Sequence, residues 1–198
     1  MSYSVMNNMT SDLGSGFDRA RVDVGQTGFF EGREFRSYFE FSADVSPSTA
    51  ILVGGSRSFK FTSPVDFVLQ SQIVEVDKGG VRVRAFINAT DGGGWAAVPV
   101  IAKNRSPNRR QFNTGYYVGQ ATFSTGGTFT GGTEVDVLRA RTASQTASQT
   151  VAAANVGAAQ GDERYLPAGS YYIIIQPLAG VSESSEGTYS ISWEERPQ

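Results

Sequence analysis

The alternation of apolar and polar residues with a period of two is the feature that most constrains how this chain can fold. Residues 81–87 read VRVRAFI, in which apolar residues at every second position alternate with Arg82 and Arg84. Successive side chains of a strand point to opposite faces, so the pattern predicts a β-strand with one buried face. Residues 35–41, FRSYFEF, repeat it, with three phenylalanines on one face and Arg36, Tyr38 and Glu40 on the other.

Similar segments follow along the chain, separated by glycine-rich turns. Further strands are predicted at 57–62, 64–76, 97–102, 115–124, 133–142, 171–177 and 188–194. Lys78-Gly79-Gly80 predicts a hairpin turn, because glycine adopts the positive φ that such turns require. Eight to ten strands without intervening helices predict an all-β chain that folds as an antiparallel β-sandwich. The strand number and the long connections favour a jelly roll over an up-and-down barrel.

Two parts of the chain lack this pattern. Residues 1–36 begin with a polar stretch and continue with alternating charges interrupted by glycines, which predicts an extended N-terminal arm before a sandwich at 37–198. Residues 142–161 contain the tandem TASQTASQT and are predicted to be a low-complexity loop insert, for which a helix or a partner-ordered segment is the alternative. With 198 residues and 39% hydrophobic content, a single sandwich domain is expected.

The composition excludes several functional classes. The chain has no cysteine and no histidine, which removes disulfides, thiolate metal sites and imidazole acid–base chemistry. A net charge of −2 gives no general attraction for nucleic acid or an anionic membrane. No apolar run is long enough for a membrane-spanning helix, and the N-terminus lacks the features of a secretory signal. No phosphate loop, nucleophile elbow or dinucleotide fingerprint appears, so no cofactor is expected.

Carboxylate chemistry is the catalytic alternative that the composition leaves open. A glycosidase-type pair needs only two acids, and the candidates are Glu134 with Asp136, or Asp162 with Glu163. Glu134 and Asp136 should share a strand face, but they alternate with valines as an ordinary solvated face does. The segment 88–92, NATDG, is a weak match to a calcium loop without the distal glutamate. We therefore expect neither an enzyme nor a metal site.

Arginines and aromatic residues are the candidates for contacts with partners. Phe29 and Phe30 are apolar in an otherwise polar arm, so they are predicted to anchor it, either on a neighbouring subunit or on the chain's own sandwich. Fourteen arginines stand against three lysines, which fits either an interface or a compositional bias. The arginines selected as interface candidates are Arg33, Arg36, Arg105, Arg109 and Arg110, the last three in the basic loop KNRSPNRRQF at 103–112.

Adjacent tyrosines give a second set of candidates. Alternation puts one residue of each pair outward in Tyr116-Tyr117 and in Tyr171-Tyr172. Outward tyrosines suit protein interfaces or stacking on sugars. Tyr117 and Trp95 are therefore predicted to be contact residues.

Two stretches of the chain carry a family resemblance. VDVGQTGFFEGREFRSYFEF with FTSPVDFVLQ resembles the N-terminal part of virion proteins of tailed bacteriophages. GGTEVDVLRAR with LPAGSYYIIIQPLAGVSESSEGTYSISWEER is similar to the C-terminal strands of the same proteins. Part of this motif also occurs in bacterial accessory β-sandwiches attached to secreted enzymes.

The resemblance implies a β-sandwich on the surface of a virion. The expected function is that of a non-enzymatic capsid decoration or cement subunit, a homo-oligomer with a trimer favoured, made in the host cytoplasm and bound to the major capsid protein or other virion proteins. An extended arm can reach a neighbouring subunit by strand addition. The alternative is a tail, fibre or adhesin module that binds a host glycan through Trp95 and outward tyrosines.

Overall fold

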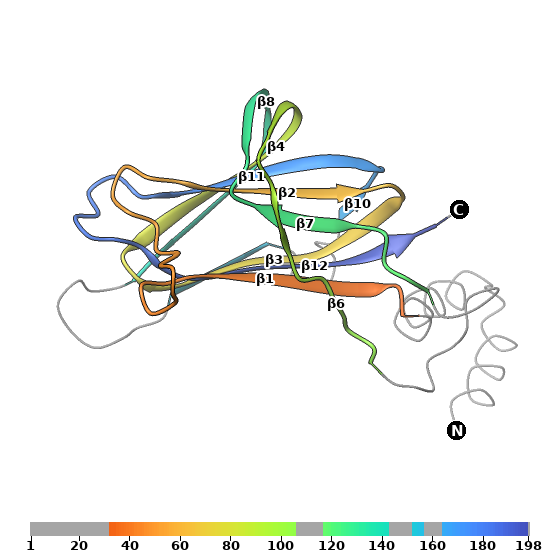
Figure 1. Cartoon of the computed structure of the whole chain (residues 1–198), viewed down its shortest axis with the longest axis horizontal. Coiled ribbons are helices and arrows are strands. Elements are labelled where there is room, and N and C mark those ends of the chain that lie inside the picture. The colour runs from red at the N-terminus through yellow and green to blue at the C-terminus, as the bar shows by residue number, and fades with distance from the viewer. Residues whose placement is uncertain (1–31, 106–116, 143–151, 157–163, 198) are drawn as a thin grey trace, which may run out of the picture.

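The computed structural model describes residues 32–105, 117–142, 152–156 and 164–197, and these ranges contain twelve β-strands and no helix (Figure 1). The strands are β1 (Glu34–Phe41), β2 (Arg57–Ser63), β3 (Asp66–Lys78), β4 (Gly80–Gly93), β5 (Ala96–Val98), β6 (Ile101–Ala102), β7 (Thr122–Thr125), β8 (Thr128–Arg141), β9 (Ala152–Val156), β10 (Arg164–Leu166), β11 (Gly169–Pro177) and β12 (Glu186–Arg196). No membrane-spanning helix is found among the described residues.

The strands form two antiparallel sheets that pack face to face. The first sheet has the order β10-β3-β12-β1-β6, with β9 also paired to β3, and the second has the order β5-β7-β2-β11-β4-β8. In Figure 1 the two sheets lie one above the other with the core between them. The predicted antiparallel β-sandwich is thereby confirmed.

The order of strand pairing identifies the topology as a jelly roll. β1 pairs with β12, β2 with β11, β3 with β9, and β4 with β8, so that early strands pair with late ones in a nested series. Successive pairs alternate between the two sheets, which is the double Greek key arrangement of a jelly roll. β5, β6, β7 and β10 are short additions to this scheme.

Aromatic side chains fill the space between the sheets. The rings of Phe59 and Phe123 stack with centroids 5.4 Å apart, and Phe61 meets Trp193 edge to face at 5.0 Å. Val81 and Val83 of β4 are buried in this core, whereas Arg84 of the same strand reaches Glu134 on the outer face. The predicted alternation of β4 is confirmed, and burial of large apolar surfaces stabilises the sandwich.

Four local predictions differ from the structure, the first being the strand predicted at 115–124, of which only Thr122–Thr125 (β7) is a strand in the described part. Gly79, with φ of 77°, does make a tight turn, but it leads from β3 in the first sheet to β4 in the second, so it is not a hairpin. The single strand predicted at 97–102 is two strands in different sheets, because Pro99 lacks the amide hydrogen needed to continue a ladder. Part of the 142–161 insert forms β9, which belongs to the jelly roll itself.

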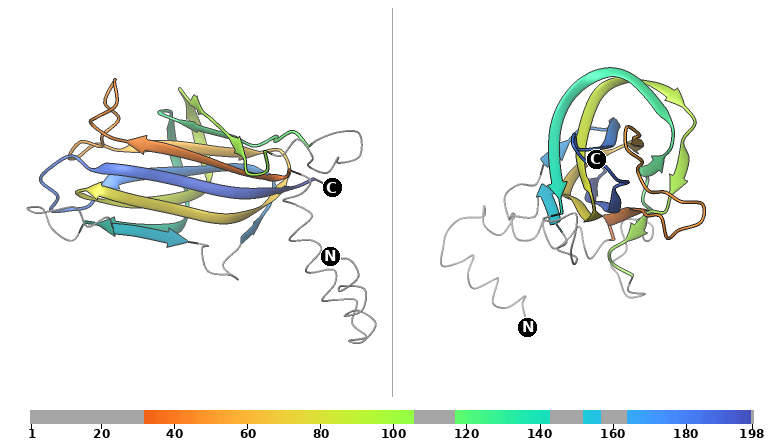
Figure 2. Two further views of the ribbon diagram at one scale, coloured as in Figure 1. Left: turned by 90° about the horizontal axis from the view of Figure 1, so that it is seen from below. Right: turned by 90° about the vertical axis from the view of Figure 1, so that its left-hand side faces the viewer.

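β4 and β8 pair along most of their length and bend together over the outer face of the second sheet, although β5, β6 and β7 lie between them in the sequence. Figure 2 shows both strands curving around the sandwich. The pairing shifts register at Ala85/Phe86 and at Asp91/Gly93, and Asn88 between them has φ of 57°. Such bulges sharpen the twist and bend of a strand pair. The bent β4–β8 pair covers Tyr172, whose ring lies 5.1 Å from that of Phe129 on β8 and which is only 4% exposed.

Candidate assembly interface

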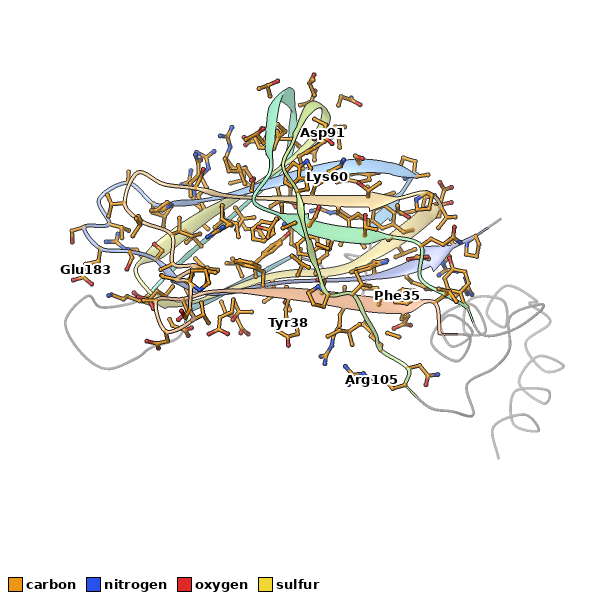
Figure 3. All side chains as sticks on the ribbon, viewed as in Figure 1. Phe35, Tyr38, Lys60, Asp91, Arg105 and Glu183 are labelled. Atoms are coloured by element: carbon orange, nitrogen blue, oxygen red, sulfur yellow. The ribbon has the colours of Figure 1, made fainter. Side chains whose placement is uncertain are left out.

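The predicted arm and the predicted basic loop join the sandwich at the same end. The backbone oxygen of Arg33, at the base of the arm, accepts a hydrogen bond of 2.9 Å from the Glu195 amide. The amide of Lys103, where the basic loop begins, donates to the Glu34 oxygen at 2.9 Å. Figure 3 places Phe35 and Arg105 toward this end and Glu183 at the opposite one. Arm and loop are thus attached to one small region around the start of β1 and the end of β12.

A buried carboxylate organises this region. Glu195 is fully buried and accepts hydrogen bonds from the Tyr117 hydroxyl at 2.6 Å, the Ala121 amide at 2.9 Å and the Trp193 indole at 3.3 Å. The Gln120 amide donates to it as well. Burial and the bond to Glu195 raise the pKa of the Tyr117 hydroxyl, so this group remains a donor. The segment that follows the basic loop is therefore fixed to β12.

Charged side chains surround this carboxylate. Arg33 lies 3.5 Å from the Glu194 carboxylate, which also meets Arg196 at 2.9 Å, and Arg33 donates to the Glu195 backbone oxygen at 3.2 Å. Lys103 pairs with Glu34 at 3.3 Å. Three cations thus pair with two carboxylates beside Glu195, which itself is held by uncharged donors.

Close packing of Phe35 completes the attachment. Its ring lies 6.0 Å from that of Trp193 and 6.2 Å from that of Tyr117. A Cβ on Gly119 would lie 2.7 Å from Cε1 of Phe35, so only glycine permits the chain to pass this close.

The predicted interface residues fall into three groups. Arg36 is exposed on the outer face of β1 beside Tyr38, which is 54% exposed. Arg105 is also exposed and is the last described residue before the gap at 106–116. Arg33 is buried, 8% exposed, in the charged cluster. Phe29, Phe30, Arg109 and Arg110 lie outside the described residues.

The prediction for the tyrosine pairs is confirmed in part. Tyr117 is buried rather than outward, because its hydroxyl bonds to Glu195 and its ring packs on Phe35. Tyr171 packs against the core, and Tyr172 on the other face is covered by Phe129 of β8. Strand alternation assigned opposite faces correctly to Tyr171 and Tyr172, but it could not foresee that the bent β4–β8 pair covers the outer one.

Glu195 was missed as a buried structural residue, although a signal was available. Trp193 and Glu195 stand two positions apart on β12 and therefore share a face. A glutamate in register with a buried tryptophan indicates a carboxylate that points into the core. The sequence prediction ended this strand at residue 194, one residue before Glu195.

Trp95 occupies a separate site between β4 and β5, beside the bent β4–β8 pair. Its indole donates to Asp91 Oδ1 at 2.7 Å and its ring lies 6.1 Å from that of Tyr172. A Cβ on Gly127 would lie 2.3 Å from the Trp95 ring, so the ring rests directly on this glycine. The hydrogen bond from Lys60, followed by those from Trp95 and Gly93, lowers the pKa of Asp91 to about 2. Trp95 is held in one orientation and remains partly exposed.

The carboxylates considered for catalysis are engaged separately. In the register of β4 with β8, Ala85 pairs with Asp136 and Phe86 with Glu134, so Val135 is an extra residue in a bulge. Glu134 consequently pairs with Arg84, whereas Asp136 pairs with Arg164 at 2.8 Å. The expectation that the two acids share a face is therefore wrong. Asp162 and Glu163 lie outside the described residues, and the described residues contain no group of three or more potential metal ligands.

Comparison with known proteins supplies no relative. No protein-family model, no curated protein and no solved structure matches this chain.

Proposed function

We propose that this chain is a non-enzymatic virion protein of a tailed bacteriophage, a capsid decoration or cement subunit that binds the major capsid protein at the particle surface. The observation that carries the proposal is the attachment of the arm and both sides of the basic loop to one end of the sandwich. Two segments that join the sandwich in the same region can contact the same neighbour. The proposal includes a homo-oligomer, with a trimer favoured.

The physical argument rests on how the attachment is built. A segment that bridges subunits must be attached to a rigid part of its own domain. Here that part contains the buried Glu195 carboxylate, which accepts hydrogen bonds from four groups and lies next to packed aromatic rings. Extended arms bind neighbours by adding a strand or by placing side chains in pockets. Jelly rolls occur both in viral capsids and in lectins, so the fold agrees with the proposal without selecting it.

The decisive experiment removes the arm without disturbing its base. The deletion should end at residue 31, because Arg33 is buried against Glu194 and β1 begins at Glu34. Phage heads purified without this protein are mixed with wild-type or truncated chain, and binding and thermal stability of the heads are measured. We expect the truncation to abolish binding and the gain in head stability. Unchanged binding by the truncated chain would overturn the proposal.

A loop variant and a matched control locate the contact. Arg105, Arg109 and Arg110 are replaced together by alanine, and Arg141→Ala is the control. Arg141 is an exposed arginine paired with Gly80, at the end of the sandwich opposite to the loop. The loop variant should weaken binding to heads, whereas the control should bind normally. Light scattering measures the number of subunits in the free protein. A protein that is monomeric both in solution and on the heads would contradict the trimer.

The second candidate function is that of a tail, fibre or adhesin module that binds a host glycan. It is favoured by the fixed orientation and partial exposure of Trp95, because sugars stack on aromatic rings. A glycan array probed with the wild-type chain and with Trp95→Ala tests it. Adsorption to host cells that depends on Trp95 would favour this function over the first. Silence on the array with unchanged adsorption would exclude it.

A further inference from the structure

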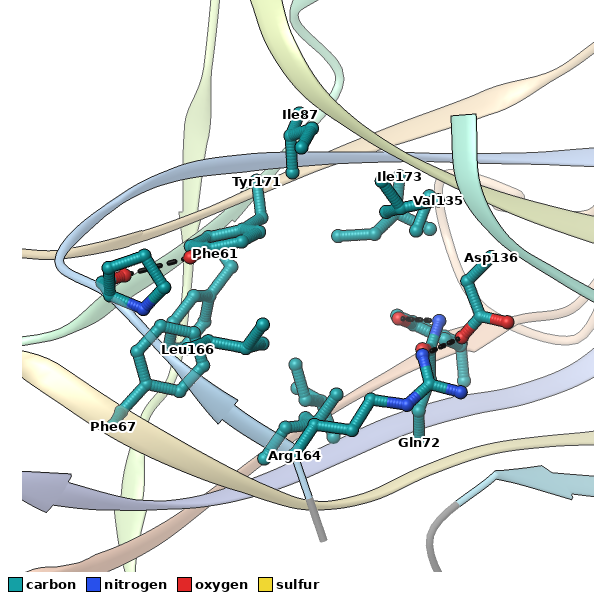
Figure 4. Close-up of a pocket in the computed structure, with 15 residues that line it drawn as sticks. Phe61, Phe67, Gln72, Ile87, Val135, Asp136, Arg164, Leu166, Tyr171 and Ile173 are labelled. Carbon is teal, nitrogen blue, oxygen red and sulfur yellow. Dashed lines mark hydrogen bonds and ion pairs between the residues drawn. The ribbon is translucent and has the colours of Figure 1, made fainter. Parts of the chain in front are cut away.

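The jelly roll is open along one side, where it holds a cavity of about 350 Å³. The cavity lies between the two sheets, where β8 at the edge of the second sheet faces β10 at the edge of the first. Figure 4 shows its lining side chains arranged around an open centre. Ligand sites in proteins begin at about this volume. The cavity is separate from the arm and loop, so an inference about it does not depend on the proposed function.

The walls of this cavity are almost entirely apolar. They are formed by aromatic and branched aliphatic side chains, chiefly Phe61, Phe67, Leu69, Ile87, Leu166 and Ile173. An apolar cavity of this kind does not hold ordered water well, because a buried water needs two or more polar partners. The space therefore suits an apolar guest.

One polar side chain deep in the cavity has hydrogen-bonding capacity to spare. Gln72 is 4% exposed, lines the cavity, and donates to the Tyr189 hydroxyl at 2.9 Å. This is its one side-chain hydrogen bond among the described residues, and the amide has a second N–H and a carbonyl oxygen besides. If the amide were turned over, its oxygen would accept from the Tyr189 hydroxyl and both N–H groups would remain as donors. A hydroxyl can match either orientation, because it both donates and accepts.

The charges at the mouth cancel. Arg164 of β10 pairs with Asp136 of β8 at 2.8 Å, so this ion pair joins the edges of the two sheets beside the opening (Figure 4). An anionic guest would have to compete with Asp136 for Arg164, and a cationic guest would have to compete with Arg164 for Asp136. A neutral guest disturbs neither residue.

We propose that this cavity binds a small neutral molecule that is largely apolar and carries one hydroxyl group, which hydrogen-bonds to Gln72. An apolar cavity of about 150 Å³ accepts benzene, and by proportion this one accepts a molecule of about fourteen non-hydrogen atoms. The apolar part packs among the phenylalanine and isoleucine side chains. The ion pair of Asp136 and Arg164 stays intact.

Two probes of equal size test the proposal. 2-(2-Naphthyl)ethanol and 2-propylnaphthalene differ by a hydroxyl in place of a methyl group, and their dissociation constants for the full chain are measured by calorimetry. Both should bind at one site. In the double variant Gln72→Leu/Tyr189→Phe, the dissociation constant of the alcohol should rise about tenfold relative to that of the hydrocarbon. This variant removes the amide without leaving a buried hydroxyl unpaired. An unchanged ratio would contradict the role of Gln72.

A filled cavity provides the second arm of the test. Ala85 lines the cavity, so Ala85→Leu should abolish the binding of both probes. Ala97→Leu is the matched control, because Ala97 lies in the same sheet but is exposed on β5, and this variant should bind as the wild type does. Failure of both probes to bind the wild type would overturn the proposal. So would binding that survives in a folded Ala85→Leu variant, because the probes would then lie elsewhere.

Discussion

Two buried polar side chains in this sandwich, Glu195 and Gln72, differ in how much of their hydrogen-bonding capacity is used. Glu195, at the arm end, accepts hydrogen bonds from two side chains and two backbone amides and has no capacity left for a ligand. Gln72, at the open side, makes one side-chain hydrogen bond and faces an apolar cavity. Both residues lie on strands of the same sheet and both are nearly inaccessible to solvent.

The difference separates a structural site from a binding site. A buried polar group that is fully paired rigidifies the fold, whereas one with spare capacity carries a cost that a ligand can relieve. The arm end is therefore suited to hold attached segments in place, and the open side is suited to accept a guest. Disrupting the arm end should therefore lower the free energy of unfolding, whereas filling the cavity at the open side should raise it.

The largest effect is expected at the fully paired site. In Glu195→Gln an amide nitrogen would face groups that are themselves donors, so hydrogen bonds to a charged acceptor are lost and a donor is left unpaired. We expect the free energy of unfolding to fall by about 3 kcal/mol, measured by urea denaturation. Glu183→Gln is the control, because Glu183 is exposed and pairs with Lys78, itself half exposed, at 3.4 Å. Equal loss in both variants would remove the distinction between the sites.

The second effect concerns pH and the partner of Gln72. Complete burial raises the pKa of Tyr189, so above pH ~10 the unfolded chain loses this phenolic proton while the folded chain keeps it. The protonated Tyr189 side chain therefore contributes fully to stability below pH ~10, and this contribution declines above that pH. The free energy of unfolding should fall by about 1.4 kcal/mol per pH unit more steeply in the wild type than in Tyr189→Phe. Parallel slopes would show that Tyr189 ionises without unfolding.

The third effect has the opposite sign. Ala85→Leu fills part of the apolar cavity, so it should raise the free energy of unfolding by about 1 kcal/mol, as cavity-filling substitutions commonly do. Differential scanning calorimetry of Ala85→Leu and of the exposed control Ala97→Leu measures it. A loss of stability in Ala85→Leu alone would mean that the cavity is too rigid to accept the added carbons.

Much of the fold could be predicted because period-two alternation records which face of a strand is buried. It located β1, β2 and β4 and placed Arg82 and Arg84 outside. The strand number and long connections led to the jelly roll. β9 was missed because Ala152–Val156 shows no alternation, and its pairing with β3 depends on contacts far apart in the sequence.

The two polar sites could not be predicted to the same degree. Glu195 follows Trp193 at strand spacing, so its burial was accessible from the sequence. The cavity was not, because it arises from the separation of two sheet edges and from the bulge at Val135, which turns Asp136 toward Arg164. Bulges depend on three-dimensional pairing and leave no clear local signal here.

The smallest effect extends the comparison to an exposed carboxylate. Both tryptophans donate their indole N–H to a carboxylate, Trp95 to Asp91 at 2.7 Å and Trp193 to Glu195 at 3.3 Å, but only Glu195 is buried. The hydrogen bonds from Lys60, Trp95 and Gly93 lower the pKa of Asp91 to about 2. These bonds are therefore fully formed at a pH above the ordinary pKa of an aspartate, and they are lost as the pH falls through about 2. The indole NMR signal of Trp95 should shift with a midpoint near pH 2, while that of Trp193 reports only global unfolding. In Asp91→Ala the Trp95 transition should disappear with little change in stability. A midpoint near 4 in the wild type would show that these bonds do not hold Asp91 in solution.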